Sequence, residues 1–412
     1  MKKQTNIQQN MIRQNKCYVL KRIAEIPYLL PVGQLIADQR RGIQINETGA
    51  FLWELLQKDR SLEELTKLCA KHYDADTKDL PKLRKDIQEF VTKLCAQGIL
   101  VSASDSLFEE PFCEEAVWND PFSGAHSCKY IRIAGLTCML SAPAQAFPAQ
   151  LDAFACEPVE KLHQKIQVLS HAPAIHENGT LILRDKELAV IECREKYILL
   201  FPASPQIAEA HLSKDASQCV FYCTAPFNRS FRNELFNALQ LPFFYLAHRH
   251  QMVILHSSSV RYEGQAWLFS AASGTGKSTH ANLWHSYLRA PILNGDLNLL
   301  ALRRGRPVIH GIPWCGSSGI ADTGTHPLGG IFLLRQSSED YVERLSEDQK
   351  RLLVLQRLIS PAWDGKLYER SLRLVDAIAG QILICRLHCT PRIYAMNAVL
   401  NEIQIYQRIK NS

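Results

Sequence analysis

The sequence has little that would suit a membrane protein or a nucleic-acid-binding protein. No apolar stretch approaches the roughly 20 residues needed to cross a bilayer. The first residues are polar and carry no signal-peptide apolar segment, so we expect a cytoplasmic protein with no membrane partner. The net charge of +6 is small for 412 residues and is not concentrated in one run, so we expect no nucleic-acid partner.

Paired cysteine motifs are absent as well. The 13 cysteines are scattered, and the two close pairs, Cys219 with Cys223 and Cys385 with Cys389, lack the C-x-x-C spacing of zinc sites and redox motifs. We therefore interpret both pairs as core residues or plain reduced thiols in preference to a metal site. The chain also has no internal repeat and no low-complexity tract.

What the sequence does have is the composition of a globular protein, with 46% hydrophobic and 21% charged residues. A chain of 412 residues is too long for one ordinary domain. We predict the α/β (α+β) class, with a small winged-helix-like domain and a larger nucleotide-binding one. The predicted division is a first domain at 1–103, a linker at 104–125, a β-rich extension at 126–250 and a catalytic domain at 251–412.

Local patterns predict the elements of these parts. The first part is expected to contain strands at 17–23, 27–32 and 98–101 and helices that begin at Asn46, Ser61 and Leu80. Ser61 and Glu64 form a capping box, which marks the start of the second helix. Further along, helical patterns cover 229–248, 347–359 and 372–385.

The most informative motif is a run of small residues between a strand pattern at 265–269 and a helical pattern at 280–288. Its sequence, S-A-A-S-G-T-G-K-S-T over 270–279, matches the phosphate-loop pattern G-x-x-x-x-G-K-[ST], with alanine at the first glycine position. In such loops the backbone N–H groups converge on phosphate oxygens, the lysine reaches the terminal phosphates and the hydroxyl contacts Mg²⁺. We therefore predict that ATP and Mg²⁺ are bound. The predicted nucleotide-binding residues are Ala271, Ala272, Ser273, Gly274, Thr275, Gly276, Lys277, Ser278 and Thr279.

Three neighbouring segments could add chemistry to this loop. His256 ends a strand that is expected to form a hairpin with the strand entering the loop. Asp296 ends an apolar strand at 292–296, where a Mg²⁺ contact or a general base belongs. Residues 308–319 predict a substrate loop, with His310, Pro313, Trp314, Ser317 and Ser318 as its candidate residues. Taken singly, each segment also has a structural alternative: a packed histidine, a turn aspartate, or a buried turn anchored by Trp314.

The chain thus carries three motifs: His256 in L-H-S-S-S-V, the loop S-G-T-G-K-S-T and the acid in L-N-G-D. Together they resemble the catalytic domain of the HPr kinase/phosphorylase family and its phosphoenolpyruvate-carboxykinase-like relatives. The resemblance covers about residues 253–318 and implies catalytic roles for His256, Lys277 and Asp296, with Mg²⁺ on Ser278 and Asp296. Family members often carry two adjacent acids, whereas this chain has Gly295 before Asp296. His310 falls where the family places a metal-contacting glutamate, so its role stays open. Because the family often assembles, the resemblance also implies a homo-oligomer.

The first part of the chain contains the segment from Ile43 to Leu56, the next two helices and Gly98-Ile99-Leu100. Together they resemble the PqqD-type peptide-recognition domain, over nearly all of residues 17–103. Such domains bind the leader of a ribosomally made precursor peptide as an extra strand beside their sheet and against the third helix. From the residues alone, a DNA-binding winged helix is the rival interpretation. Asp86 and Glu89 interrupt the basic residues of its third helix, which argues against it. A purely structural domain that caps the kinase also stays open.

Together the two resemblances imply an ATP- and Mg²⁺-dependent kinase that binds the leader of a precursor peptide and phosphorylates a Ser or Thr hydroxyl in its core. Tethering by the leader would raise the effective concentration of the acceptor. Two alternatives remain: a kinase for a small molecule such as free serine, and a non-catalytic nucleotide-dependent scaffold that presents the peptide. The sequence does not identify the peptide, the phosphorylated residue, the reversibility of the transfer or the later fate of the phosphate.

Overall fold

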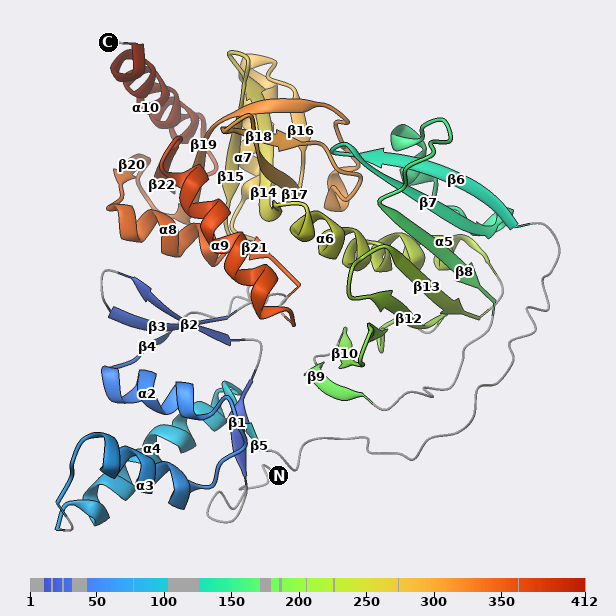
Figure 1. The fold of residues 1–412 in the computed structure, drawn as a ribbon. Coiled ribbons are helices and arrows are strands. Elements are labelled where there is room, and N and C mark those ends of the chain that lie inside the picture. The colour runs from blue at the N-terminus through green and yellow to red at the C-terminus, as the bar shows by residue number, and fades with distance from the viewer. Residues whose placement is uncertain are drawn as a thin grey trace.

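The computed structural model describes most of the chain. The described residues are 11–15, 18–23, 26–31, 43–76, 78–102, 126–170, 179–184, 187–204, 206–224, 227–272, 274–361 and 363–411. The predicted linker at 104–125 and the loop residue Ser273 lie outside these ranges. Within them the fold is mixed α/β, as predicted, and it is organised around several sheets (Figure 1).

The first part combines two small sheets with three helices. Its elements are β1 (Ile12–Gln14), β2 (Tyr18–Ile23), β3 (Ile26–Pro31), β4 (Ile43–Gln44), α2 (Glu47–Leu55), α3 (Leu62–His72), α4 (Leu80–Ala96) and β5 (Leu100–Ser102). Strands β2, β3 and β4 form one antiparallel sheet in that order, and β1 pairs with β5. The predicted helix starts are confirmed: Asn46 Oδ1 accepts the N–H of Gly49 at 2.8 Å, and Ser61 and Glu64 form the capping box. Leu52, Leu65 and Val91 are buried between the helices.

The second part is one eight-stranded sheet with two helices after it. Its strands are β6 (His126–Ile133), β7 (Leu136–Pro143), β8 (Gln164–Leu169), β9 (Thr180–Arg184), β10 (Ala189–Glu192), β11 (Lys196–Leu200), β12 (Ile207–Ser213) and β13 (Gln218–Cys223), in the order β6-β7-β8-β13-β12-β11-β10-β9. The helical pattern at 229–248 forms α5 (Arg229–Ala238) and α6 (Gln240–Arg249). The buried amide of Gln164 in β8 donates to the carbonyl of Pro242 in α6, which links the sheet to that helix.

The third part is a nine-stranded sheet flanked by helices. Its elements are β14 (Met252–Tyr262), β15 (Gln265–Ser270), α7 (Lys277–Leu288), β16 (Ile292–Asn294), β17 (Leu297–Arg303), β18 (Arg306–His310), β19 (Thr325–Gln336), β20 (Tyr341–Arg344), α8 (Glu347–Leu355), β21 (Leu358–Ile359), α9 (Gly365–Ala379), β22 (Leu383–Cys389) and α10 (Ile393–Asn411). The strand order is β15-β14-β17-β18-β19-β22-β20, and β15 also pairs with β19. Strand β14 is the central strand of this part, because it pairs with four others: β15, β16, β17 and β21.

Two of the helices predicted from the sequence end earlier in the structure. The pattern at 347–359 forms α8 only up to Leu355, and Leu358–Ile359 is strand β21, paired with β14. The pattern at 372–385 belongs to α9 only up to Ala379, and strand β22 then begins at Leu383, parallel to β19. Both strands are short apolar runs whose pairing partners lie far away in the sequence, so local periodicity did not reveal them. Helix α10 was not predicted.

In the described ranges, no helix is both long and apolar enough to span a membrane.

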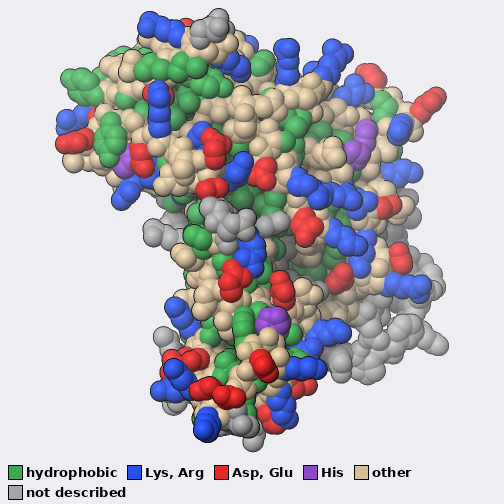
Figure 2. Space-filling model, turned by 60° about the vertical axis from the view of Figure 1, so that its left-hand side comes forward, with side chains coloured by type: hydrophobic (Ala, Val, Ile, Leu, Met, Phe, Trp, Pro, Cys, Tyr) green, Lys and Arg blue, Asp and Glu red, His purple; other side chains and the backbone are tan. Residues whose placement is uncertain are grey.

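Cys219 and Cys223 are fully buried in the core, and burial raises the pKa of Cys223 to about 12. Cys385 is buried and Cys389 is half-buried. On the face drawn in Figure 2, acidic and basic side chains are interspersed over the first part of the chain.

Two buried histidines make the stability of the fold sensitive to acid. Burial lowers the pKa of His248 to about 4 and that of His280 to about 3. Because the unfolded chain binds protons near pH 6.5 and the folded chain does not, stability is complete above that pH and is lost progressively as the pH falls. We expect a loss of up to about 1.4 kcal/mol per pH unit for each histidine, measured by urea unfolding between pH 7 and 5.

The variant His280→Gln provides the control. Its amide oxygen can still accept the indole N–H of Trp284, which lies 3.2 Å from Nε2 of His280, but it does not titrate. Its pH slope should therefore be shallower than that of the unmodified chain. An unfolding free energy that stays flat from pH 7 to 5 in the unmodified chain would contradict this prediction.

Candidate functional site

The glycine loop, residues 271–276, connects strand β15 to helix α7 in the arrangement predicted from the sequence. Gly274 and Gly276 adopt φ angles of +75° and +110°, which few other residues tolerate. No side chain of the described residues caps helix α7, so among these residues the N–H groups of its first turn have no intrahelical or capping partner. Ser278 and Thr279 are exposed on this turn, whereas Lys277 is only 8% exposed. The loop can therefore hold an anion.

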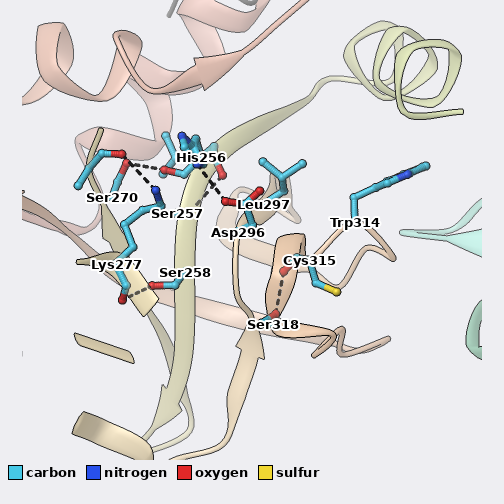
Figure 3. A network of polar contacts seen from close by, with 12 residues as sticks. His256, Ser257, Ser258, Ser270, Lys277, Asp296, Leu297, Trp314, Cys315 and Ser318 are labelled. Carbon is cyan, nitrogen blue, oxygen red and sulfur yellow. Dashed lines mark hydrogen bonds and ion pairs between the residues drawn. The ribbon is translucent and has the colours of Figure 1, made fainter. Parts of the chain in front are cut away.

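His256 and Asp296 form a polar pair near this loop (Figure 3). Nε2 of His256 lies 3.0 Å from Oδ1 of Asp296. The two meet because β14 and β17 are antiparallel neighbours in which His256 lies opposite Leu297. His256 lies in the middle of β14, which continues to Tyr262, and not at a strand end as we expected. The hairpin between β14 and β15 is confirmed.

Two serine hydroxyls fix the strands around this pair. Ser258 Oγ donates to the carbonyl of Lys277 at 3.0 Å, which ties the start of α7 to β14. Ser270 Oγ donates to the carbonyl of His256 at 2.7 Å, which ties the end of β15 to the same strand. These two hydrogen bonds thus hold the start of α7, which carries Lys277, and the end of β15 against β14, which carries His256 (Figure 3).

Asn294 organises the turn that carries Asp296. Its side chain is 1% exposed, and its Oδ1 accepts the backbone N–H groups of Asp296 at 2.9 Å and Leu297 at 3.0 Å. Its Nδ2 donates to the carbonyls of Ile312 at 3.1 Å and Trp314 at 3.3 Å. One buried amide therefore joins the Asp296 turn to the segment that follows β18.

Trp314 anchors that segment in the core. Its Nε1 donates to the carbonyl of Phe236 at 2.8 Å, and its ring packs against Phe243 and Phe244. Trp314 is 3% exposed, and Pro313 beside it is buried too. Both residues support the loop from inside, so neither is on the surface where a substrate would bind.

Ser317 and Ser318 lie on an exposed 3₁₀ turn, Gly316–Ser318, which packs directly on Asp296. A Cβ atom added to Gly316 would lie 2.9 Å from Cβ of Asp296, and one added to Gly295 would lie 2.2 Å from Oγ of Ser318. Glycine at both positions therefore allows the turn to reach the carboxylate. Within the predicted substrate loop, Gly316 lies against Asp296 and Ser318 lies against the preceding Gly295, whereas Val308–His310 itself belongs to strand β18.

The charges of the site are coupled. Burial would raise the pKa of Asp296, but the hydrogen bond and charge of His256 and the charge of Lys277 outweigh it, so this pKa lies below its usual value. Burial lowers the pKa of Lys277, against the attraction of Asp296 and with the repulsion of Arg357. Asp296 is therefore a carboxylate at neutral pH, and the buried amine of Lys277 lies near it.

His310 lies in a different place. Its Nδ1 contacts Oγ1 of Thr325 at 2.8 Å, and its ring lines a separate cavity together with Arg303. Burial, with the charges of Arg303 and His326, lowers the pKa of His310 to about 4. No hydrogen bond or ion pair joins it to Asp296 in the described part of the chain. The structure does not bring His310 into the group formed by His256, Lys277 and Asp296.

A second cavity, of about 380 Å³, adjoins the glycine loop. It is lined by Gly274, Thr275, Gly276, Thr279, His280, Leu283, Gln336, Ser337, Cys389, Thr390 and Pro391. Asp340 fixes its far wall, because its carboxylate accepts the backbone N–H and the hydroxyl of Thr390. The volume is within the range of small-molecule sites.

The described residues contain no cluster of three or more His, Cys, Asp or Glu side chains that could hold a metal by themselves. A hydroxyl and a carboxylate, as on Ser278 and Asp296, suit Mg²⁺ that is held mainly by phosphate oxygens and water. The residue types at the site therefore fit the predicted ion.

Four residues that organise the site are not among the candidates predicted from the sequence: Ser258, Ser270, Asn294 and Asn298. Asn298 donates to the carbonyl of Ser257 at 2.7 Å and is 1% exposed. The available signal was that these polar residues interrupt otherwise apolar strands, since buried polar side chains require partners.

The comparisons with known proteins concern the first part of the chain. Residues 34–100 match the family model PqqD, described as coenzyme PQQ synthesis protein D. No curated protein matches the chain. The matched range contains β4 and the three helices α2, α3 and α4. Residues 34–100 are therefore a PqqD-type domain, which lies within the range 17–103 expected from the sequence.

Proposed function

We propose that this protein is an ATP-dependent kinase of precursor peptides, which binds the leader through its PqqD-type domain and phosphorylates a Ser or Thr hydroxyl in the core. The main support is the arrangement at the site: a buried lysine begins a helix after a glycine loop, and a carboxylate held by His256 lies close to it. The PqqD match supports the peptide substrate, because domains of this kind bind ribosomally made precursors.

The glycine loop would hold the phosphates. The uncapped N–H groups at the start of α7 and the ammonium of Lys277 provide positive charge on one side. The 380 Å³ cavity beside Gly274 and Thr279 would take the nucleoside. Ser278 and Asp296 would hold Mg²⁺, which supplies charge neutralisation for the transferred phosphoryl group.

In the proposed transfer, the acceptor hydroxyl oxygen forms a bond to the γ-phosphorus while the bond from that phosphorus to the bridging oxygen of ADP breaks. Asp296 accepts the hydroxyl proton, and His256 orients the carboxylate through its hydrogen bond to Oδ1. Lys277 stabilises the charge that develops on the leaving phosphate. The acceptor would approach over the exposed turn at Gly316–Ser318, which borders Asp296.

The leader would bind along the edge of β4. In the described residues, no strand pairs with β4 on the side away from β3. The N–H of Ile45 donates to the carbonyl of Pro27 in β3. Backbone groups of successive residues in a strand point in opposite directions, so the N–H and carbonyl of Gln44 point away from β3, to the open edge. Phe90 of α4 lies close to the same segment, since both Phe90 and Ile45 approach Gly49. A strand added here would therefore run beside α4.

This geometry predicts the effect of Gln44→Pro. Proline removes the one outward N–H donor of the edge and leaves the bonds between β3 and β4 intact. We expect the dissociation constant of the leader peptide to rise roughly 2- to 10-fold, which corresponds to one lost hydrogen bond. Fluorescence anisotropy with a labelled leader peptide measures the change.

The variant Gln44→Ala keeps the N–H and is the matched control, so it should bind the leader almost as the unmodified chain does. Leader affinity that is unaffected by Gln44→Pro would show that the peptide does not pair with β4. A second measurement, thermal unfolding, should be nearly the same for both variants because Gln44 is exposed.

Mass spectrometry tests the proposed reaction. The protein is incubated with ATP, Mg²⁺ and each short peptide encoded beside its gene, and the intact peptide masses are measured. We expect one peptide to gain the mass of one phosphate on a Ser or Thr. If ATP is consumed only with free serine or a similar alcohol, the small-molecule kinase is the correct function, and if no acceptor is phosphorylated the proposal is wrong.

A further inference from the structure

A charged cavity in the described part of the chain lies away from the glycine loop. It has a volume of about 990 Å³ and opens between the turn after β6, the end of α6, strands β17 and β18, and helix α9. Its lining residues with charged or titratable side chains are His250, Arg303, His310, Arg370 and Arg373. In the described part of the chain, no aspartate or glutamate lines it.

The three arginines have no carboxylate partner in the described residues, although the molecule pairs many of its other charges. Arg344, Arg351 and Arg386, for comparison, each have one within 4 Å. Arg370 and Arg373 are three positions apart on α9, so they face the same side of the helix and repel each other. Arg303 adds a third cation from β17, on the far side of the cavity opening. An arrangement of like charges around one hollow is unfavourable until an anion neutralises it.

The remaining lining can also serve a ligand. His310 is 9% exposed, and because its Nδ1 contacts Thr325, its other ring nitrogen is left for the cavity. Met252, Leu302 and Leu374 supply an apolar wall. Guanidinium groups bind phosphate and carboxylate oxygens in pairs, which sets the chemistry of the occupant.

We propose that this cavity is a second anion-binding site, which takes a small molecule carrying two or more phosphate or carboxylate groups. Arg303, Arg370 and Arg373 bind the anionic groups, and the buried ring of His310 contacts the same ligand from the floor of the cavity. The site is separate from the glycine loop: it surrounds Met252 at the start of β14, whereas His256 and the loop lie further along that strand and at the end of β15.

Calorimetric titration of the full chain tests the proposal without nucleotide or peptide. Pyrophosphate and citrate are the two probes, because one carries phosphates and the other carboxylates. The triple variant Arg303→Ala/Arg370→Ala/Arg373→Ala should bind at least one probe more than about tenfold more weakly at the cavity. Since all three side chains are exposed, the variant should fold normally, which thermal unfolding verifies. Whichever probe binds identifies the chemistry of the ligand.

Two further variants separate the cavity from the glycine loop and from general charge. Lys277→Ala weakens only the loop, so it should retain the cavity site. Arg194→Ala/Arg261→Ala/Arg408→Ala removes the same charge from exposed positions elsewhere and should bind both probes normally. Binding of neither probe outside the loop, equal binding by the cavity variant, or equal loss in the charge control would overturn the proposal. The cavity result does not depend on whether the chain is a kinase.

Discussion

Replacing Lys277 with alanine is expected to lower phosphate transfer by about 10²- to 10³-fold, the cost of removing a preorganised charge from a phosphate site. Among the described residues its Nζ makes one long hydrogen bond, 3.5 Å to the carbonyl of Ala271, and burial already lowers its pKa. A buried amine whose hydrogen bond is long, and whose neighbouring carboxylate of Asp296 is also held by His256, is placed for a ligand and not for stability. The transfer rate with saturating peptide, measured by mass spectrometry, is the readout.

The unfolding free energy of Lys277→Ala provides the control. Because the variant removes a desolvated charge, it should be as stable as the unmodified chain or more stable without nucleotide, while ATP should stabilise it much less. Lys277→Arg keeps the charge but changes its shape, so we expect only partial recovery. A Lys277→Ala variant that transfers phosphate at the normal rate would remove the glycine loop from the reaction.

Asp296→Asn is the second substitution with a large expected effect. The amide keeps the size of the side chain and an oxygen that can accept from His256, but it cannot accept the proton of the acceptor hydroxyl. We expect kcat to fall by about 10²- to 10⁴-fold. Since the backbone of Asp296 is held by Asn294 and Ser257, the fold should be unaffected.

A measurement of ATP binding without Mg²⁺ distinguishes the loss of the proton acceptor from a loss of nucleotide binding. The dissociation constant of ATP should change little in Asp296→Asn, because the phosphates would contact the loop and Lys277. His256→Gln should cost less, since it removes only the group that orients the carboxylate. Full activity of Asp296→Asn with normal ATP binding would show that another group accepts the proton.

The parts of the fold that depend on neighbouring residues could be predicted from the sequence. Asn46 and the Ser61–Glu64 box fix helix starts through contacts three residues apart, and the glycines of the loop fix its φ angles locally. For the same reason, the strand, loop and helix around Lys277 were placed correctly.

The parts that depend on pairing between strands far apart in the sequence could not be predicted. Strands β21 and β22 pair with β14 and β19, and the apolar periodicity did not separate them from the helices before them, although Gly380 marks the end of α9. Register also decides which candidate residues meet: it brings His256 beside Asp296 and places His310 at a separate cavity that helix α9 also lines. The arginine cavity joins β17 to residues of α9 far along the chain, so only the folded structure reveals it.

The dependence of transfer on the leader tests the central claim most directly. Phosphate transfer is measured at a low, equal concentration of the full precursor and of its leaderless core, with the unmodified chain and with Gln44→Pro. Because binding of the leader raises the local concentration of the core, the full precursor should be phosphorylated many times faster, and Gln44→Pro should reduce this advantage without slowing the core. Equal rates for the two peptides would contradict the account, since the PqqD-type domain would then contribute nothing to the reaction.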